Sequence, residues 1–442
     1  MVGITLMMRR NPPPTRRAFM AAMGVATLGP LALSAAPAWG WQAVRLAPRA
    51  DSLGLRPGGA DTPVWSFGGP ELRLVRGQSQ EVLFENSLPV PTVLNWRGLD
   101  GAAASEPLLG RPPVAPGSRE TRDISMPHAG TLMVDLRLLE DGLKQPIRPL
   151  PVLVEEAEPV AVDRDEVFMV EDWRLAPDGT AMVPGSAGGD GAPIYTVNGK
   201  VAPDLTLRAK ERLRLRFING CHRAVIAVKI EGVEVTVMAL DGQPAEPFVA
   251  RNGALVLAPA GRADVFLDGT ASSGAVSPIL LHDGKEARTV ARLLASNDPP
   301  VRPSRLPPAA PLPSNGLPAE LNLKAALRFD VALGAADNVW TRPATFAASA
   351  PPAFRAKAGR TVVLALSNRG PVANVFHLHG HHFRLLDRLD DGWKPYWLDT
   401  LAVEPGQTQR IAFAATYPGR WLIESSATDW AAPRLVRWYA VE

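Results

Sequence analysis

The sequence predicts an all-β protein built from consecutive β-sandwiches, and two observations carry that prediction. The 442-residue chain contains 44 prolines and 38 glycines, which suits strands joined by turns better than long helices. Many short segments alternate between apolar and polar side chains or run apolar, and glycine or proline bounds them. With 46% hydrophobic and 21% charged residues, the chain has the composition of a globular protein with a large buried core.

The N-terminal residues 1–38 read as an export signal and are set apart from the folded part. Residues 15–20, with their Arg16–Arg17 pair, resemble a twin-arginine signal, and an apolar run leads to a small-residue cleavage motif at residues 36–38. An ordinary secretory signal with chance arginines is the alternative. Because the twin-arginine route exports folded proteins, we expect the mature protein to act in the periplasm.

Charge and cysteine content exclude several classes of protein. Removing residues 1–38 would take away four arginines and no acidic residue, so the formal charge would fall from +3 to −1. That balance gives no basis for nucleic-acid binding. No later apolar run has the length of a membrane-spanning helix, so we expect no membrane span after signal removal. The single cysteine, Cys221, excludes an internal disulfide and is interpreted as a small buried core residue.

The first predicted sandwich occupies residues 41–158. Its strand candidates are short apolar or alternating segments bounded by turn residues, namely residues 72–75, 81–84, 129–134 and 152–154.

The second predicted sandwich occupies residues 160–295, with strand candidates at residues 205–207, 212–217, 224–228, 233–237 and 263–267. Residues 212–217 alternate strictly between arginine and an apolar side chain. The sequence therefore predicts that Arg212, Arg214 and Arg216 form a solvated sheet face.

A linker and a third sandwich complete the predicted organisation. Residues 297–318 hold eight prolines and little hydrophobic periodicity, which is typical of a linker. The third sandwich is predicted over residues 321–442, with strands at residues 361–366, 374–386, 409–413 and 437–441. Short strands with turns between them favour antiparallel sandwiches.

Four of the seven histidines lie in one stretch, where residues 377–382 read His-Leu-His-Gly-His-His. A His-x-His pair on a strand places both imidazoles on the same face, as two ligands of one metal require. Imidazole suits copper and zinc. His381 and His382 fall on opposite faces, so we expect at least one to be exposed. His128, His222 and His282 stand singly near turns and indicate only surface or local hydrogen bonding.

The arrangement of motifs resembles the multicopper oxidase family across nearly the whole mature chain. The segments that carry the resemblance are residues 195–200, 214–219 and 241–244 of the middle sandwich, and residues 377–381, 398–400, 405–406 and 418–421 of the last. The resemblance implies three consecutive cupredoxin-like Greek-key β-sandwiches. Family enzymes carry one type 1 copper and a three-copper cluster, which together use ten histidines and one cysteine. This chain has seven histidines, so the full set of ligands is excluded by count.

The resemblance also indicates which residues stand at the family's ligand positions. At the three-copper cluster only His377 and His379 match. The other cluster positions hold residues of a different kind, namely Asn95, Arg97, Asp135, Arg137, Glu424 and Ser426. The type 1 positions hold Asn374, Ser425, Trp430 and Leu435. Ser425 cannot replace the cysteine thiolate that a blue copper site needs.

Two interpretations of the replaced positions follow. One is a salt-bridged polar plug, in which Arg97 and Arg137 face Asp135 and Glu424, and His377 and His379 cap the group as neutral, hydrogen-bonded core residues. A less favoured version of the plug holds a small anion such as carboxylate or phosphate. The other is a single copper ion on His377 and His379, with Glu424 or Asp135 as a third ligand.

These readings predict a degenerate, copper-free member of the family that resembles the SufI/FtsP-type bacterial cell-division proteins. Its function would be that of a non-enzymatic scaffold that binds envelope or periplasmic proteins, with a division- or stress-related role and no cofactor. The retained His-x-His pair departs from that type. The alternative is a residual mononuclear copper-binding protein or oxidoreductase that uses His377 and His379. A complete multicopper oxidase is disfavoured by the missing cysteine and histidines.

Overall fold

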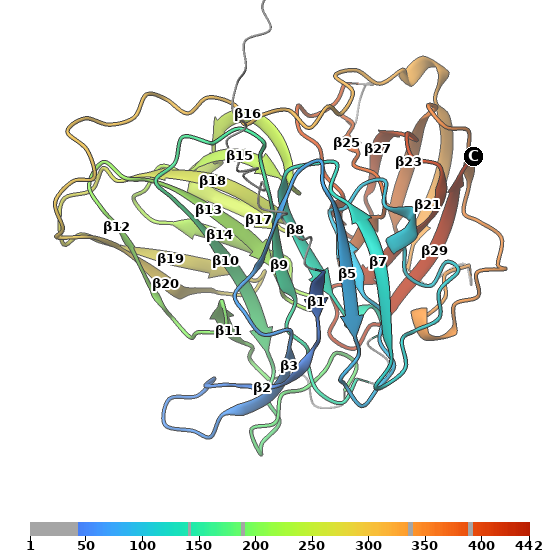
Figure 1. Ribbon diagram of the computed structural model, residues 1–442, viewed down its shortest axis with the longest axis horizontal. Coiled ribbons are helices and arrows are strands. Elements are labelled where there is room, and N and C mark those ends of the chain that lie inside the picture. Colours follow the sequence, from blue (N-terminus) through green and yellow to red (C-terminus); the bar gives the residue numbers. More distant parts are fainter. Residues whose placement is uncertain (1–42, 140–142, 187–190, 335–338, 388–391) are drawn as a thin grey trace, which may run out of the picture. The chain divides into compact units, whose positions relative to one another are not determined.

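The computed structural model describes residues 43–139, 143–186, 191–334, 339–387 and 392–442 (Figure 1). The predicted export signal at residues 1–38 lies outside the described residues. Within them, no helix has the length and apolar character needed to span a membrane.

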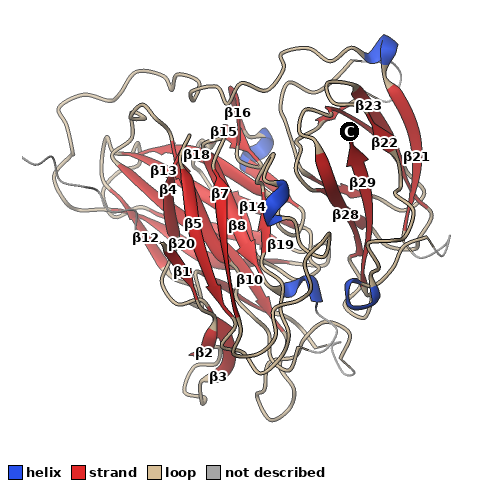
Figure 2. Ribbon diagram, turned by 45° about the vertical axis from the view of Figure 1, so that its right-hand side comes forward, coloured by secondary structure: helices blue, strands red, loops and turns tan. Residues whose placement is uncertain are grey.

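The predicted all-β fold class is confirmed: three consecutive cupredoxin-like β-sandwiches make up the described chain (Figure 2). The described helical elements are short 3-10 turns, namely η1 (Ala103–Ser105), η2 (Arg137–Leu139), η3 (Arg251–Gly253), η4 (Leu323–Ala325) and η6 (Pro343–Thr345).

The first sandwich contains strands β1 to β9. One sheet has the order β1-β5-β7, and the facing sheet has the order β4-β9-β8-β6, with β2 and β3 as a separate pair. The bounds are β1 Val44–Leu46, β2 Arg49–Leu53, β3 Thr62–Ser66, β4 Leu72–Val75, β5 Ser79–Glu85, β6 Asn95–Arg97, β7 Arg119–Ser125, β8 Gly130–Asp135 and β9 Leu150–Glu155.

The second sandwich contains strands β10 to β20. Its sheets have the orders β11-β10-β13-β18-β15-β16 and β12-β20-β19-β14-β17. The bounds are β10 Arg164–Trp173, β11 Ile194–Val197, β12 Asp204–Leu207, β13 Arg212–Asn219, β14 Ile226–Ile230, β15 Thr236–Leu240, β16 Gln243–Val249, β17 Ala254–Leu257, β18 Arg262–Asp268, β19 Val276–His282 and β20 Ala287–Ala295.

The third sandwich contains strands β21 to β29. Its sheets have the orders β21-β23-β27-β25 and β22-β29-β28-β24-β26. The bounds are β21 Leu327–Leu333, β22 Arg355–Ala356, β23 Thr361–Asn368, β24 Asn374–Leu378, β25 Arg384–Leu385, β26 Thr400–Val403, β27 Thr408–Ala414, β28 Gly419–Ala427 and β29 Arg434–Val441.

Most strand pairs are antiparallel, as expected, but the large sheets are mixed. Each of the six large sheets contains one parallel pair, namely β1 with β5, β4 with β9, β10 with β13, β12 with β20, β21 with β23 and β22 with β29. A parallel pair needs a long connection, and strands that change sheets along the chain provide it. Turn signals reveal where strands end, but they do not reveal which strand pairs with which.

Each sandwich has its own apolar core, and further apolar clusters join the sandwiches. Met133 and Leu153 of the first sandwich pack with Met169 and Ile218 of the second. Val93 and two leucines of η2 pack with Leu422 and Trp438 of the third. Apolar side chains therefore hold the first sandwich against both the second and the third.

The arginine face of β13 is buried, which corrects the prediction of a solvated face. Arg212, Arg214 and Arg216 are 4%, 1% and 1% exposed. Arg214 and Arg216 both contact Asp264 on the neighbouring β18, and Arg216 donates to the hydroxyl of Thr131 in the first sandwich. Alternation correctly separates the two faces of a strand, but it cannot tell whether another sandwich covers the polar one.

Candidate functional site at the former ligand positions

Strand pairing brings the substituted ligand positions together from two sandwiches. In the third sandwich β24 pairs antiparallel with β28, so His377 lies opposite Glu424. In the first sandwich β6 pairs antiparallel with β8, so Asn95 lies opposite Asp135. Both pairs are fully buried. Because side chains alternate along a strand, Asn95 and Arg97 share one face of β6, and that face meets Glu424.

Glu424 is the centre of the contacts between these groups. Its carboxylate accepts from Arg97 at 2.9 Å, from the side chain of Asn95 at 3.2 Å and from Arg434 at 2.7 Å. Burial alone would raise the pKa of Glu424, but Arg97 and Arg434 outweigh it and hold the pKa well below its usual range. Glu424 is therefore an anion at neutral pH, held by two guanidinium groups.

Asp135 forms the second anionic position. Arg137 binds it at 3.0 Å, and the Nε of Arg97 lies 3.7 Å away. Burial favours the neutral acid, yet Arg137 and Arg97 lower the pKa of Asp135. Arg137 also donates to the backbone carbonyl of Gly220 in the second sandwich at 2.7 Å. All three sandwiches therefore contribute atoms to the group.

The two histidines of the His-x-His pair differ in charge. His379 is placed between two carboxylates, with Nδ1 2.9 Å from Glu106 and Nε2 2.8 Å from Glu424. Burial lowers the pKa of His379, but the two carboxylates outweigh it and raise the pKa to about 9. His379 is thus an imidazolium at neutral pH, which differs from the neutral cap expected from the sequence. Two carboxylate acceptors keep a proton on both nitrogens.

His377 remains uncharged. Its Nδ1 lies 2.8 Å from the hydroxyl of Thr400 and 3.6 Å from Asp399. Burial, with help from the positive charges of Arg97 and His379, lowers the pKa of His377 well below its usual value. The hydrogen-bonded, neutral state expected for the pair therefore applies to this histidine alone.

Little space remains among these side chains. A cavity of about 20 Å³ is left, which can hold about one water molecule. Its lining comprises Arg97, Asp135, Arg137, Cys221, Pro259, Ala260, Val375, His377, Glu424, Ser426 and Arg434. Ser426 thus reaches the cavity from the strand that carries Glu424. Cys221 is fully buried in the second sandwich's core, as the sequence suggested.

We call this group the Glu424 network. Its members are Asn95, Arg97, Glu106, Asp135, Arg137, His379, Glu424 and Arg434. The sequence did not single out Arg434 or Glu106. Arg434 lies opposite Ser426 because β29 pairs antiparallel with β28, and the sequence does not reveal that pairing.

The type 1 positions form ordinary hydrogen bonds and packing contacts. The Ser425 hydroxyl donates to the Asn374 side chain at 2.7 Å and accepts from the backbone of Gly334 at 3.0 Å. Leu435 lies in the core of the third sandwich. Trp430 packs against the guanidinium of Arg174, whose Cζ lies 4.4 Å from the centre of the indole ring.

Comparison with known proteins agrees with this architecture. A multicopper oxidase family model matches residues 320–442, and a second multicopper oxidase model matches residues 164–275. The chain belongs to the multicopper oxidase family.

Relatives of the chain match it at low identity over different shares of its length. Multicopper oxidase MmcO of Mycobacterium tuberculosis is 26% identical over 417 residues, covering 80% of this chain and 78% of that protein. Copper resistance protein A of Pseudomonas syringae pv. tomato is 25% identical over 243 residues, 40% of this chain and 38% of that protein. The crystal structure of a multi-copper oxidase from Pseudomonas thermotolerans superposes with a TM-score of 0.75 at 26% identity, covering 91% of this chain and 99% of that one.

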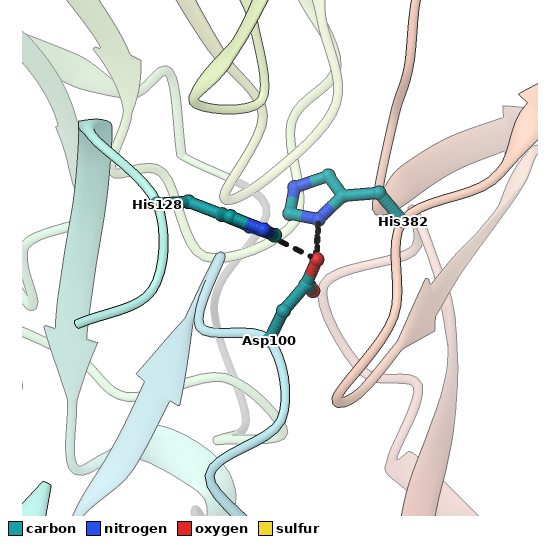
Figure 3. Close-up of side chains that lie close together, drawn as sticks. All are labelled: Asp100, His128 and His382. Carbon is teal, nitrogen blue, oxygen red and sulfur yellow. Dashed lines mark hydrogen bonds and ion pairs between the residues drawn. The ribbon is translucent and has the colours of Figure 1, made fainter. Parts of the chain in front are cut away.

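The family member described here contains a second buried histidine cluster that sequence reasoning missed. His381 and His382 are 2% and 3% exposed, so the expectation of an exposed member of this pair is wrong. His128 is also buried, and it meets His382 at the carboxylate of Asp100 (Figure 3). Burial lowers the pKa of His382, but Asp100 outweighs it and raises the pKa to about 9. We call Asp100, His128 and His382 the Asp100 cluster.

Proposed function

We propose that this member of the multicopper oxidase family does not assemble the type 1 and three-copper centres and works as a non-enzymatic binding scaffold. The Glu424 network carries the proposal. A three-copper cluster needs neutral imidazoles with free lone pairs. At the corresponding positions the chain has the guanidinium groups of Arg97 and Arg137, and His379 holds protons on both nitrogens.

The donor set does not fit copper ions for an electrostatic reason. Arg97, Arg137 and Arg434 bring three permanent positive charges to a buried volume, and a copper ion would add more. Within that volume the anions Glu424 and Asp135 are already neutralised by contacts of 2.7–3.0 Å. The remaining cavity of about 20 Å³ has room for one water. The residues at these positions therefore do not fit a copper cluster.

The network has a structural role that fits a scaffold. Breaking a buried ion pair by removing one partner costs about 3–5 kcal/mol, because the other charge stays buried and uncompensated. The network links the first sandwich through Arg97 and the third through Glu424, and Arg137 extends it to the second. It therefore fixes the three sandwiches to one another, which leaves their outer surfaces as the parts that bind partners.

The place of action and the partners follow from the sequence. The twin-arginine-like residues 15–20 support export to the periplasm, where envelope proteins would be the partners. The likeness to SufI/FtsP-type proteins supports a role in cell division or stress. Crosslinking in intact cells, with the exported protein as bait, tests this part: capture of division or envelope proteins supports it, and a failure to export the protein contradicts it.

The decisive test of the copper-free state compares copper content between the exported wild type and a His377→Ala, His379→Ala variant, both purified from copper-supplied cells. We expect no copper that depends on these two histidines and no intense blue absorption. Stoichiometric copper that disappears in the variant would overturn the proposal.

One observation favours a second candidate, a mononuclear metal site. Ligand atoms of His377, His379 and Glu424 lie within 4.8 Å of one another. Metal binding there would require His379 to lose a proton that Glu106 and Glu424 stabilise. The wild type and the double variant also test this candidate. It requires one equivalent of copper in the wild type, without blue absorption, and the loss of that copper in the variant.

A further inference from the structure

The Asp100 cluster lies where all three sandwiches meet. Asp100 and His128 belong to the first sandwich, and His382 follows β24 in the third. Figure 3 shows the two imidazole rings converging on the Asp100 carboxylate. His382 Nδ1 lies 2.8 and 2.9 Å from the two carboxylate oxygens, and His128 Nδ1 lies 3.2 Å from one of them. Asp100 and His382 are 2% and 3% exposed, and His128 is 8% exposed.

The tautomer of His382 is fixed by the second sandwich. Its Nε2 lies 2.9 Å from the backbone carbonyl oxygen of Asp241, which can only accept a hydrogen bond. Nε2 therefore carries a hydrogen, and Nδ1 is the atom that faces Asp100. A backbone carbonyl behind a histidine is the outer contact that orients metal-ligating imidazoles and increases their basicity.

The orientation of His128 is fixed by a chain of amides. The backbone N–H of Ala129 donates to Asn315 Oδ1 at 3.0 Å, so the Nδ2 of Asn315 is the atom that donates to Gln243 Oε1 at 2.9 Å. Gln243 must then turn its Nε2 toward His128 Nδ1, at 3.1 Å. His128 Nδ1 is thus the atom that faces both the Gln243 amide and the carboxylate of Asp100.

The carboxylate of Asp100 also lies beside His128. His128 Nδ1 and an oxygen of that carboxylate are 3.2 Å apart. Either a hydrogen on Nδ1 or a cation between the two atoms makes such a contact favourable. Together with His382 Nδ1, the two atoms form a set of two imidazole nitrogens and one carboxylate oxygen, all within 4.8 Å of one another.

We propose that Asp100, His128 and His382 bind one divalent metal ion of the zinc class. Two imidazoles and a carboxylate are ligands that zinc accepts at about 2.0–2.2 Å, with a fourth position for water. In the metal-free protein a proton shared with His382 holds the group together, and the ion takes the place of that proton. The Gln243 amide has to release His128 Nδ1 when the ion enters.

The site would act as a structural clamp between sandwiches. It would connect the loop after β6 and the loop before β8 directly to the loop after β24, while Asp241 and Gln243 support it from the second sandwich. It is centred on Asp100 rather than on Glu424. Asp399 lies beside both groups, 3.8 Å from His382 Nε2 and 3.6 Å from His377 Nδ1.

The experiment uses the full exported chain, freed of metal with a chelator and titrated with Zn²⁺ and with Co²⁺. We expect one equivalent of ion per chain, a visible Co²⁺ spectrum of four-coordinate type, and a melting temperature that rises by a few degrees with saturating zinc. Asp100→Asn and His382→Gln should abolish all three signals. The matched control His282→Gln, at an exposed histidine, and the His377→Ala, His379→Ala variant should retain them.

A variant that should bind the metal more tightly keeps the proposal testable even if the loss-of-binding variants fail to fold. Gln243→Glu keeps the acceptor for Asn315 and places a carboxylate oxygen beside both Nδ1 atoms, so metal affinity should rise at least tenfold. The proposal is overturned if the wild type binds no ion at millimolar zinc, if Asp100→Asn binds as tightly as the wild type, or if Gln243→Glu leaves the affinity unchanged.

Discussion

The chain contains two buried clusters of histidines and carboxylates that differ in how their charges are balanced. In the Glu424 network, Glu424 and Asp135 are paired with guanidinium groups, and His379 has an acceptor on both nitrogens. In the Asp100 cluster, one carboxylate faces two imidazoles, whose Nδ1 atoms lie 2.8 and 3.2 Å from it. Histidine content alone therefore does not make a metal site. Permanent positive charges occupy the first cluster, whereas the second consists of one carboxylate and two imidazoles.

The largest effect is expected when the balance of the Glu424 network is broken. Glu424→Gln keeps the shape of the side chain but removes the anion that Arg97 and Arg434 both contact, so the free energy of unfolding should fall by about 3–5 kcal/mol. Urea unfolding at pH 7 measures it. Glu442→Gln removes an exposed partner of Arg355 and should cost less than about 1 kcal/mol. Equal, small losses in both variants would mean that the network is not an ion-paired unit.

The next largest effect is a loss of stability toward alkaline pH, to which both clusters contribute. The pKa values of His379 and His382 are raised to about 9 in the folded protein, against about 6.5 in the unfolded chain. A histidine whose pKa is raised in the folded state stabilises the folded protein fully below about pH 6.5. This stabilisation is lost as the pH rises through about 9. Each histidine contributes at most on the order of 3 kcal/mol.

Unfolding free energies measured from pH 6 to pH 10 test this, and they also separate the clusters. His382→Gln should flatten part of the decline and leave the part that comes from His379. A wild-type stability that stays level or increases over this range would show that neither histidine is charged in the folded protein.

The sequence predicted the fold class because local alternation of apolar and polar side chains is set by the strand itself. It also pointed to residues that do lie together, such as Arg97 and Glu424, because the His-Leu-His-Gly-His motif fixed the register of the ligand positions. It failed where a second sandwich decides the environment. Arg214 and Arg216 look like solvent-facing residues until the first sandwich covers them. His128 and His382 look unrelated, because 254 positions of chain separate residues that only tertiary folding brings to Asp100.

A moderate effect is expected for Arg434→Met. This variant tests whether the remaining cations of the Glu424 network are enough to neutralise Glu424. Glu424 would keep its contacts with Arg97 and His379, so the loss should be about 1.5–3 kcal/mol, the usual value for one hydrogen bond to a charged group. The measurement is urea unfolding of both single variants and the double variant with Glu424→Gln. In the Glu424→Gln protein the Arg434 change should matter much less, and fully additive losses would contradict a direct interaction.

The smallest effect is expected for Ser425→Cys, which restores the thiol at the type 1 position. Ser425 donates one hydrogen bond to Asn374 and accepts one from Gly334, so replacing its hydroxyl should cost about 1 kcal/mol. Blue copper absorption requires a thiolate together with two histidines. Asn374 and Trp430 stand at the other positions, and a fully buried thiol without a positive partner stays protonated. Copper-treated Ser425→Cys protein should therefore remain colourless in an absorption spectrum. An intense blue band would show that the thiolate alone can bind copper at the type 1 position. The loss of the type 1 centre would then be due to the missing cysteine and not to all the replaced ligands together.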